Sequence, residues 1–314
     1  MPVAVPDPVA LVVGEALVDV LGPPHDQHRV PGGSPLNVAV GLSRLGVTTT
    51  LVTELAADAD GERIRVHARA SGVTVRADET RRTSTATVLL DADGVAGYTF
   101  DVAWSLAPDP DRDAADLDKV GLFHCGSIAA YLAPGAAGVD VLLEEAVARG
   151  AFTSFDPNIR APFVGDPDAA WRRTQAVAAR CDLVKLSDED ASFLASALGV
   201  PGEPVEAVAR ALLRGRTQLV VVTAGPRGCV VADRDGVRRF PGGPPVEVAD
   251  TVGAGDSFMA ALLAHVAGRL RRGASALPQP GNFTELEALV AYADAAARVT
   301  VTRAGADPPW HHEL

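Results

Sequence analysis

Residues 250–258 read Asp-Thr-Val-Gly-Ala-Gly-Asp-Ser-Phe, and an apolar run over residues 259–266 follows at once. Gly253 and Gly255 allow backbone N–H groups to approach an anion closely, and the helix expected next points its free N–H groups at the same place. Asp256 lies inside this anion site, although a carboxylate repels a phosphate. Its presence is explained if it accepts a proton from a hydroxyl that attacks the phosphate. The alternative interpretation is a plain helix N-terminus that Asp256 caps.

A second glycine-rich segment near the N-terminus reads Gly32-Gly33-Ser34-Pro35-Leu36-Asn37-Val38-Ala39 and continues to Leu45-Gly46. Together the two segments resemble the two signatures of the ribokinase-like (PfkB) carbohydrate kinase family. Three further segments are similar to its fructokinase branch: Gly-Glu-Ala-Leu-Val-Asp at 14–19, Asp-Pro-Asn-Ile-Arg at 156–160 and Lys-Leu-Ser-Asp-Glu at 185–189. The resemblance runs from about residue 9 to residue 309, in family order.

Composition narrows the class of protein. The chain has 314 residues, 47% hydrophobic and 22% charged, which is typical of a globular protein. A formal net charge of −12 makes nucleic acid and anionic membranes poor partners. We see no signal peptide and no run of about 18 apolar residues. Cys125, Cys181 and Cys229 lack the spacing of a Cys-x-x-Cys pair, so we expect buried free thiols and a cytoplasmic location.

The hydrophobic pattern predicts alternating strands and helices. Short Val- and Leu-rich runs, typical of buried parallel strands, occur at 9–14, 50–53, 120–125, 151–155, 181–186 and 218–223. Helical patterns fall at 36–45, 60–71, 136–149, 168–179, 188–198, 204–214, 256–268 and 285–299. We therefore expect an α/β fold. With the resemblance, it is a ribokinase-like three-layer α/β/α domain with a mostly parallel central sheet and a small β lid.

Two segments interrupt this alternation. Residues 83–102 form two β-rich runs around an Asp-Gly turn at 91–94, which predicts a hairpin, and residues 17–30 are also extended in character. We assign both to a lid built from about residues 17–35 and 80–104, within a single kinase domain spanning residues 1–314. In the resembling family such a lid closes over the sugar and excludes water. The alternative is a surface hairpin without a function.

Missing motifs exclude other nucleotide enzymes. The chain has only two lysines, Lys119 and Lys185, and neither belongs to a P-loop. The protein-kinase motifs are also missing, and no G-x-G-x-x-G follows the first strand, which argues against a dinucleotide dehydrogenase.

The resemblance implies roles for individual residues. Asp256 is the catalytic base, and the backbone amides of Gly253, Ala254 and Gly255 hold the transferred phosphate. The sugar is bound by Asp19, Gly32, Gly33, Asn37, Asn158 and Arg160. ATP is bound by Lys185, Ser187, Thr223, Gly225, Gly228 and Asp294. Taken alone, several of these have plainer interpretations: Asn37 as a polar residue of a first helical turn, Gly32-Gly33 as a turn, Arg160 as a surface charge.

Two metal ions are also implied by the resemblance. The family's Asn-x-x-Glu tetrad, associated with Mg²⁺, aligns with residues 187–190, so Asp190, one methylene shorter than Glu, would contact Mg²⁺ through water. A K⁺ ion would lie beside the anion site, held by a loop made of Asp250, Val252, Thr300, Arg303 and Gly305. The alternative is that Asp250 caps a turn.

The resulting hypothesis is an ATP-dependent sugar kinase that transfers the γ-phosphate to a primary hydroxyl of a small-molecule sugar, with fructose as the first choice. Alternatives within the family are 2-keto-3-deoxygluconate kinase, ribokinase and nucleoside kinase. A sugar-responsive binding protein derived from a kinase is the alternative outside enzymology. We also expect a homodimer that pairs through the lid.

Overall fold

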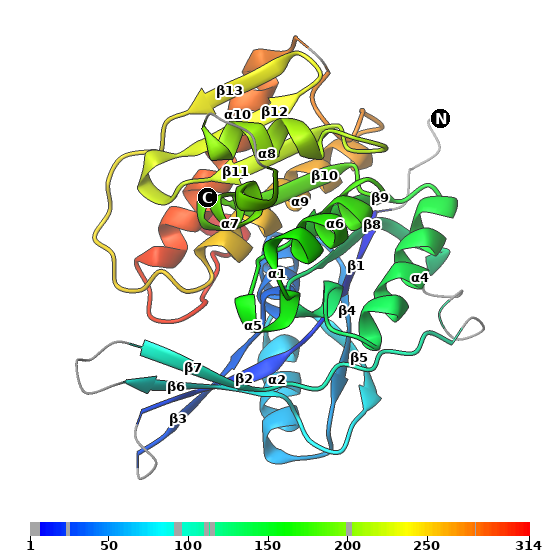
Figure 1. Ribbon diagram of the computed structural model, residues 1–314, viewed down its shortest axis with the longest axis vertical. Helices are drawn as coiled ribbons and strands as arrows, with labels where there is room; N and C mark the ends of the chain where they lie inside the picture. Colours follow the sequence, from blue (N-terminus) through cyan, green and yellow to red (C-terminus); the bar gives the residue numbers. More distant parts are fainter. Residues whose placement is uncertain are drawn as a thin grey trace.

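The computed structural model describes residues 7–22, 26–90, 96–109, 113, 117–198, 203–279 and 281–314 (Figure 1). Within these ranges, nine strands form the main sheet in the order β13-β12-β11-β10-β9-β8-β1-β4-β5. They are β1 (Val9–Val13), β4 (Thr49–Leu55), β5 (Thr74–Glu79), β8 (Val120–Gly126), β9 (Phe152–Asp156), β10 (Leu183–Ser187), β11 (Leu219–Thr223), β12 (Cys229–Asp233) and β13 (Gly236–Phe240). Pairing is parallel from β11 through to β5 and antiparallel from β11 to β13.

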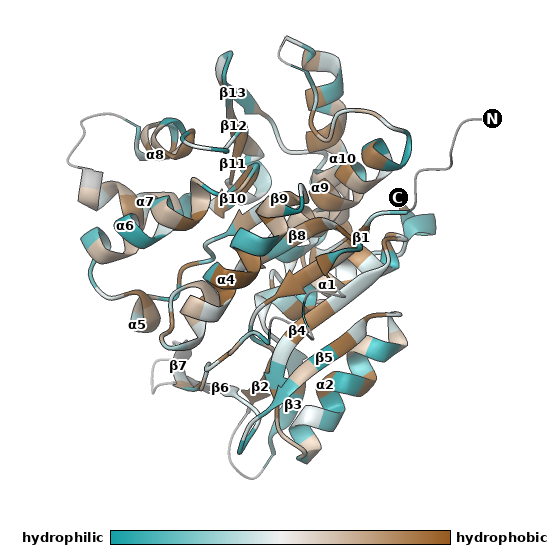
Figure 2. Cartoon of the chain, turned by 90° about the vertical axis from the view of Figure 1, so that its right-hand side faces the viewer, coloured by the Kyte–Doolittle hydropathy of each residue, from teal (hydrophilic) through white to brown (hydrophobic). Residues whose placement is uncertain are grey.

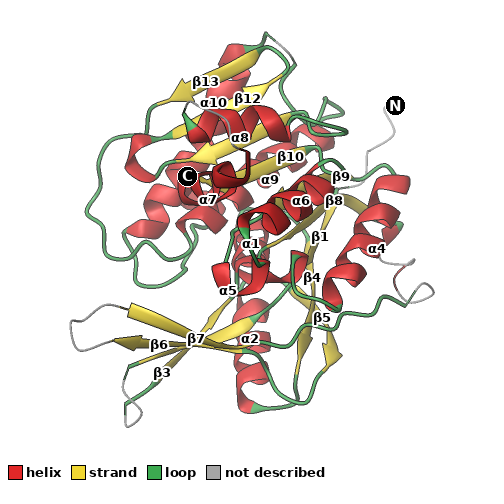
Figure 3. Cartoon of the chain, viewed as in Figure 1, coloured by secondary structure: helices red, strands yellow, loops and turns green. Residues whose placement is uncertain are grey.

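Helices cover both faces of this sheet, and Figure 3 shows the resulting layers. One face packs against α1 (Ser34–Arg44), α2 (Ala59–Ala70), α9 (Ala254–Arg271) and α10 (Phe283–Val301). The other packs against α4 (Gly135–Ala148), α6 (Pro167–Ala178), α7 (Asp188–Leu198) and α8 (Pro204–Leu212). Shorter helical turns are η1 (Ile128–Ala130), α5 (Ala161–Val164), η2 (Gly225–Arg227) and η3 (His311–Glu313).

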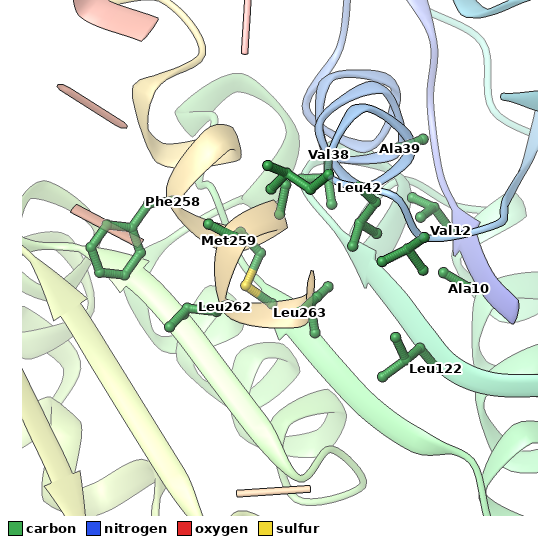
Figure 4. Close-up of a cluster of buried hydrophobic side chains, with 14 of the residues drawn as sticks. Ala10, Val12, Val38, Ala39, Leu42, Leu122, Phe258, Met259, Leu262 and Leu263 are labelled. Carbon is green, nitrogen blue, oxygen red and sulfur yellow. The ribbon is translucent and has the colours of Figure 1, made fainter. Parts of the chain in front are cut away.

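Strand β1 explains why the central strands are apolar throughout. Ala10 and Val12 face the core beneath α1 and α9, whereas Leu11 and Val13 face the opposite core. A strand buried on both faces cannot alternate polar and apolar residues. Figure 4 shows Ala10 and Val12 beside Val38 and Leu42 of α1 and Met259 of α9. In Figure 2 the hydrophobic colouring runs along β1, whereas α2 shows hydrophilic residues on its outer side.

A second, four-stranded sheet stands off the main body in Figure 1. Its order is β3-β2-β6-β7, with β2 (Leu17–Leu21), β3 (His28–Gly32), β6 (Thr85–Leu90) and β7 (Ala96–Asp101). The predicted hairpin is present, because β6 and β7 pair antiparallel from Thr85↔Asp101 to Leu90↔Ala96. The Asp-Gly turn at 91–94 lies outside the described residues. Ser34 and Pro35, expected in the lid segment, begin α1 instead.

The secondary-structure predictions can be compared with these elements. Every predicted strand and helix is present, with ends that differ by at most three residues. Strands β5, β12 and β13 were not predicted. In β5, none of the six residues is fully buried, so this edge strand lacks an apolar run. The α/β fold class is confirmed. The three cysteines are free and buried, as expected. Among the described residues, no helix has the length and apolarity needed to cross a membrane.

Candidate active site

The first turn of α9 has the backbone that an anion site requires. Gly253 adopts a left-handed conformation with φ of 76° immediately before the helix. A Cβ atom at this position would also lie 2.6 Å from the Cβ of Ala306. Glycine is therefore needed for two independent reasons. The amides that follow, up to Asp256, begin α9 and face the region in front of its N-terminus.

The Asp256 carboxylate is held by two side chains of α1. Ser34 Oγ donates to Asp256 Oδ1 at 2.6 Å, and Asn37 Nδ2 donates to Asp256 Oδ2 at 2.8 Å. Asn37 is 6% exposed, and its Oδ1 has no hydrogen-bond partner among the described residues. A buried acceptor without a partner is costly unless a ligand supplies a donor. The site therefore offers an oriented carboxylate next to an acceptor that a hydroxyl could satisfy.

A buried ion pair lies beneath this turn. Lys185 Nζ donates to Asp156 Oδ2 at 2.9 Å, and the two side chains are 5% and 1% exposed. A Cβ on Gly255 would lie 2.8 Å from Lys185 Nζ, so the ammonium abuts the glycine turn. Burial raises the pKa of Asp156 to about 6, with Lys185 opposing that rise. Burial alone would lower the pKa of Lys185, but Asp156, Asp256 and Asp190 outweigh it and raise the pKa. At neutral pH both groups are charged.

A second group of charged side chains gathers around the start of the lid sheet. Burial raises the pKa of Asp19 to about 6, and the charge of Arg160 opposes this rise. A Cβ on Gly32 would lie 2.2 Å from Asp19 Oδ2, so this glycine makes room for the carboxylate. The exposed Arg160 donates only to the backbone carbonyls of Asn158 and Ile159 among the described groups. Its guanidinium is thus free to meet a ligand.

Sequence reasoning missed Glu15, which belongs to this group. Glu15 Oε2 accepts a hydrogen bond from Ala129 N at 2.9 Å. Burial raises the pKa of Glu15 to about 7, while hydrogen bonds from Ser127 and Ala129 lower it. Ser127 in turn lies 3.5 Å from Asn158 Nδ2. Ser34 and Asp156 were also missed as individual side chains, although both lie inside the quoted motifs.

The residues predicted to bind ATP lie at several places. Thr223 ends β11, and its Oγ1 donates weakly to Leu186 O at 3.4 Å. Gly225 begins η2 and Gly228 follows it, both with positive φ, and a Cβ on Gly228 would lie 2.0 Å from Phe240 O. Asp294 Oδ2 accepts from Gly243 N and Arg298 Nε, both at 3.0 Å, so it secures the loop before residue 250. The remaining two, Lys185 and Ser187, are occupied by partners inside the protein.

The predicted metal ligands also have protein partners. Both oxygens of Asp190 accept backbone N–H groups, and those of Asp250 accept from Val252 N at 3.0 Å and Gly305 N at 2.9 Å. Thr300 is buried and donates to Ser257 Oγ, and Arg303 pairs with Asp307 and Glu313. In the described part of the chain, there is no group of three or more His, Cys, Asp or Glu side chains that could hold a metal ion.

Comparison with known proteins identifies the class of enzyme. Residues 8–313 match the pfkB family carbohydrate kinase, and the chain belongs to this family. The resemblance found in the sequence is therefore confirmed. The protein is a carbohydrate kinase, a phosphotransferase with an alcohol group as acceptor.

Several relatives and solved structures that resemble this chain are named as fructokinases. The chain is 34% identical over 305 residues to a fructokinase of Klebsiella pneumoniae, covering 94% of each chain. It is 31% identical over 286 residues to a probable fructokinase of Arabidopsis thaliana, covering 89% of this chain and 80% of the relative. A fructokinase from Xylella fastidiosa with bound ATP superposes with a TM-score of 0.82 at 27% identity, covering 98% and 94%. A Vibrio cholerae fructokinase double mutant with fructose, ADP and a potassium ion gives 0.77 at 25% identity, covering 96% and 94%.

Proposed function

We propose that the protein transfers the γ-phosphate of ATP to a primary hydroxyl of D-fructose, giving a fructose phosphate and ADP. The choice of fructose rests on the relatives named as fructokinases and on the neighbouring structure with fructose and ADP bound. The single geometric observation that carries the chemistry is the Asp256 carboxylate, held by Ser34 and Asn37 at the N-terminus of α9. We place the whole reaction in one kinase domain, residues 1–314, with the second sheet as a lid over the sugar.

The proton transfer is assigned to Asp256. Each carboxylate oxygen accepts one hydrogen bond from α1 and keeps a further lone pair for the sugar hydroxyl. The hydroxyl oxygen forms a bond to the γ-phosphorus, its proton passes to Asp256, and the bond to the ADP oxygen breaks. Phosphoryl transfer is loose, so the base accepts the proton late, and a weak base suffices. The amides of Gly253, Ala254 and Gly255 hold the charge that spreads over the transferred phosphoryl oxygens.

Sugar recognition is assigned to the groups around the lid. Asp19 would accept hydrogen bonds from two neighbouring hydroxyls, and Asn37 Oδ1 would gain the donor that it lacks among the described residues. Arg160 would donate from the N–H groups of its exposed guanidinium that the carbonyls of Asn158 and Ile159 leave free. Gly32 and Gly33 keep this region open, because a Cβ on either would lie within 2.8 Å of protein oxygens. Asn158 completes the proposed set.

The nucleotide is assigned to the neighbouring carboxyl ends of β10 and β11. Parallel strands present ligand-binding residues at this edge. Thr223, Gly225 and Gly228 follow β11, while Asp294 secures the loop of residue 243 beside them. Lys185 would act through its charge behind Gly255.

Metal ions would enter this site with the substrate. Mg²⁺ in kinases is held by one or two carboxylates together with phosphates and water, so a preformed protein cage is not required. It would supply positive charge on the phosphates. Thr300, which we expected in a loop, lies instead in the last turn of α10. For K⁺, Asp250 lies against the end of this helix and the residues that follow it, with Gly305 N donating to its carboxylate. A potassium ion in the Vibrio cholerae structure supports this proposal.

The location of the protein, its partners and its oligomeric state are proposed as well. The free thiols suit a reducing cytoplasm, and neither nucleic acid nor a membrane is expected as a partner of a chain with charge −12. The edge strand β3 of the lid sheet leaves backbone groups open for pairing, which favours a homodimer through the lid.

A sugar panel tests the proposed function. ADP release from ATP would be measured with D-fructose, ribose, 2-keto-3-deoxygluconate and a nucleoside. We expect the highest kcat/KM with D-fructose. Faster turnover of another member would move the enzyme to that substrate, and no turnover with any of them would refute the proposal.

A further inference from the structure

The first turn of α7 contains a reciprocal pair of hydrogen bonds. Asp190 N donates to Ser187 Oγ at 3.0 Å, and Ser187 N donates to Asp190 Oδ2 at 3.1 Å. This is the geometry of a capping box, with Ser187 before the helix and the acid three residues later. Asp190 is 6% exposed. The Asp190 side chain, one methylene shorter than Glu, turns back to the start of its own helix.

A third hydrogen bond joins Asp190 to the neighbouring strand end. Ile159 N donates to Asp190 Oδ1 at 2.8 Å. Ile159 follows β9 and Asp190 follows β10, and these strands are parallel neighbours in the sheet. The carboxylate of Asp190 therefore accepts one backbone amide from the end of β10 and one from the loop that follows β9.

The loop that Asp190 contacts needs an outside support. Asn158 has φ of 36°, a backbone conformation that is uncommon for residues other than glycine. Asp156 Oδ1 accepts from Asn158 N at 3.1 Å, while its other oxygen holds Lys185. The hydrogen bond to Ile159 N comes directly after the strained residue and directly before Arg160.

We propose that Asp190 is a positioning residue that fixes the loop of residues 156–160, and that it is not a ligand of metal-bound water. The effect on the sugar rests on the proposed function, because Asn158 and Arg160 are the sugar-binding residues of this loop. Removal of Asp190 loosens the loop and weakens sugar binding, whereas the response to Mg²⁺ is preserved. If Asp190 instead contacted metal-bound water, its removal would weaken the response to Mg²⁺ and leave sugar binding unchanged.

The kinetic test uses Asp190→Ala and Asp190→Asn. In Asp190→Ala the KM for fructose should rise about 10–100-fold, the scale of losing hydrogen bonds to a charged group. The Mg²⁺ concentration for half-activation should stay within about twofold of wild type. Asp190→Asn keeps one acceptor oxygen, so its KM for fructose should lie between those of the wild type and Asp190→Ala. The matched control is Glu189→Gln, an exposed neighbour on the same turn, which should leave both constants unchanged. A large rise in the Mg²⁺ constant with an unchanged KM for fructose would overturn the proposal.

A second measurement needs no substrate and so separates this proposal from the proposed function. Amide hydrogen exchange of the free, full-length protein should speed up in peptides covering residues 156–160 in Asp190→Ala, and less so in Asp190→Asn. Exchange over β1 and β8 should match wild type, which confirms that the fold is kept. Unchanged exchange at 156–160 would refute the positioning role even in an active kinase. Faster exchange would support it even if fructose were not the substrate.

Discussion

Replacing Asp256 by Asn tests the proposed base with little change to the fold. The carboxylate accepts from Ser34 Oγ at 2.6 Å and from Asn37 Nδ2 at 2.8 Å. In Asp256→Asn the remaining oxygen can still accept from Asn37. The new amide NH₂ can donate to Ser34, because a hydroxyl rotates to accept. Both contacts between α1 and α9 are therefore retained.

The expected loss lies in the chemical step. Removing a general base costs about 10²–10⁴-fold in rate. This corresponds to about 3–5 kcal/mol in the activation barrier, at 1.36 kcal/mol for each factor of ten. We expect kcat to fall by that factor in a coupled ADP-release assay with fructose. Titration calorimetry should give fructose and ATP affinities within a few-fold of wild type, and the melting temperature should be almost unchanged.

The matched control is Ser34→Ala, which keeps the carboxylate and removes one of its two donors. This variant should lose roughly tenfold in kcat, the scale of one hydrogen bond to a charged group. An Asp256→Asn enzyme that keeps more than half of the wild-type turnover would refute the assignment. A loss of stability equal to the loss of activity would mean that Asp256 acts mainly as a structural cap.

The other predictions concern the sugar site, pH and potassium. Asp19→Ala should raise the KM for fructose about 10–100-fold, from the loss of a charged acceptor, and an equal loss for ATP would contradict its role. Burial raises the pKa of Glu15 from 4.5 to about 7, so the folded protein binds a proton that the unfolded chain has released. Stability should therefore fall as pH rises through this window, and Glu15→Gln should show a smaller fall in melting temperature between pH 5 and 8; parallel curves would count against this. Replacing a bulky organic cation by K⁺ should raise the initial rate several-fold, and Asp250→Ala should abolish this rise. An unchanged rate in the wild type would refute the K⁺ site.

Local sequence was sufficient to predict those features of the fold that neighbouring residues determine. The apolar run of β1 is buried on both faces, and that requirement is visible in the residues themselves. Gly253 must adopt a positive φ before α9, so the turn is recognisable without the fold. For the same reason the order of strands and helices, and with it the α/β class, could be predicted. Strand β5 could not, since its half-exposed residues carry no distinct pattern.

The contacts within the site depend on tertiary structure. Asp256 and its two donors, Ser34 and Asn37, are separated by 222 and 219 residues and meet only because α1 packs against α9. The sequence marked each as a site residue or a motif residue, but not as hydrogen-bond partners. A motif indicates which side chains lie at one edge of the sheet. The packing of the helices determines which of these side chains form hydrogen bonds with one another.

Lys185 and Asp190 show the same division most clearly. The resemblance of their segment to the family led us to predict that both lie near a phosphate site. Only the fold brings Asp156 to the Lys185 ammonium and Ile159 N to the Asp190 carboxylate, from β9 and the loop after it, about 30 residues earlier in the chain. A buried charge must be satisfied by a nearby partner, and which partner is near follows from the register of parallel strands β9 and β10, which no local pattern encodes.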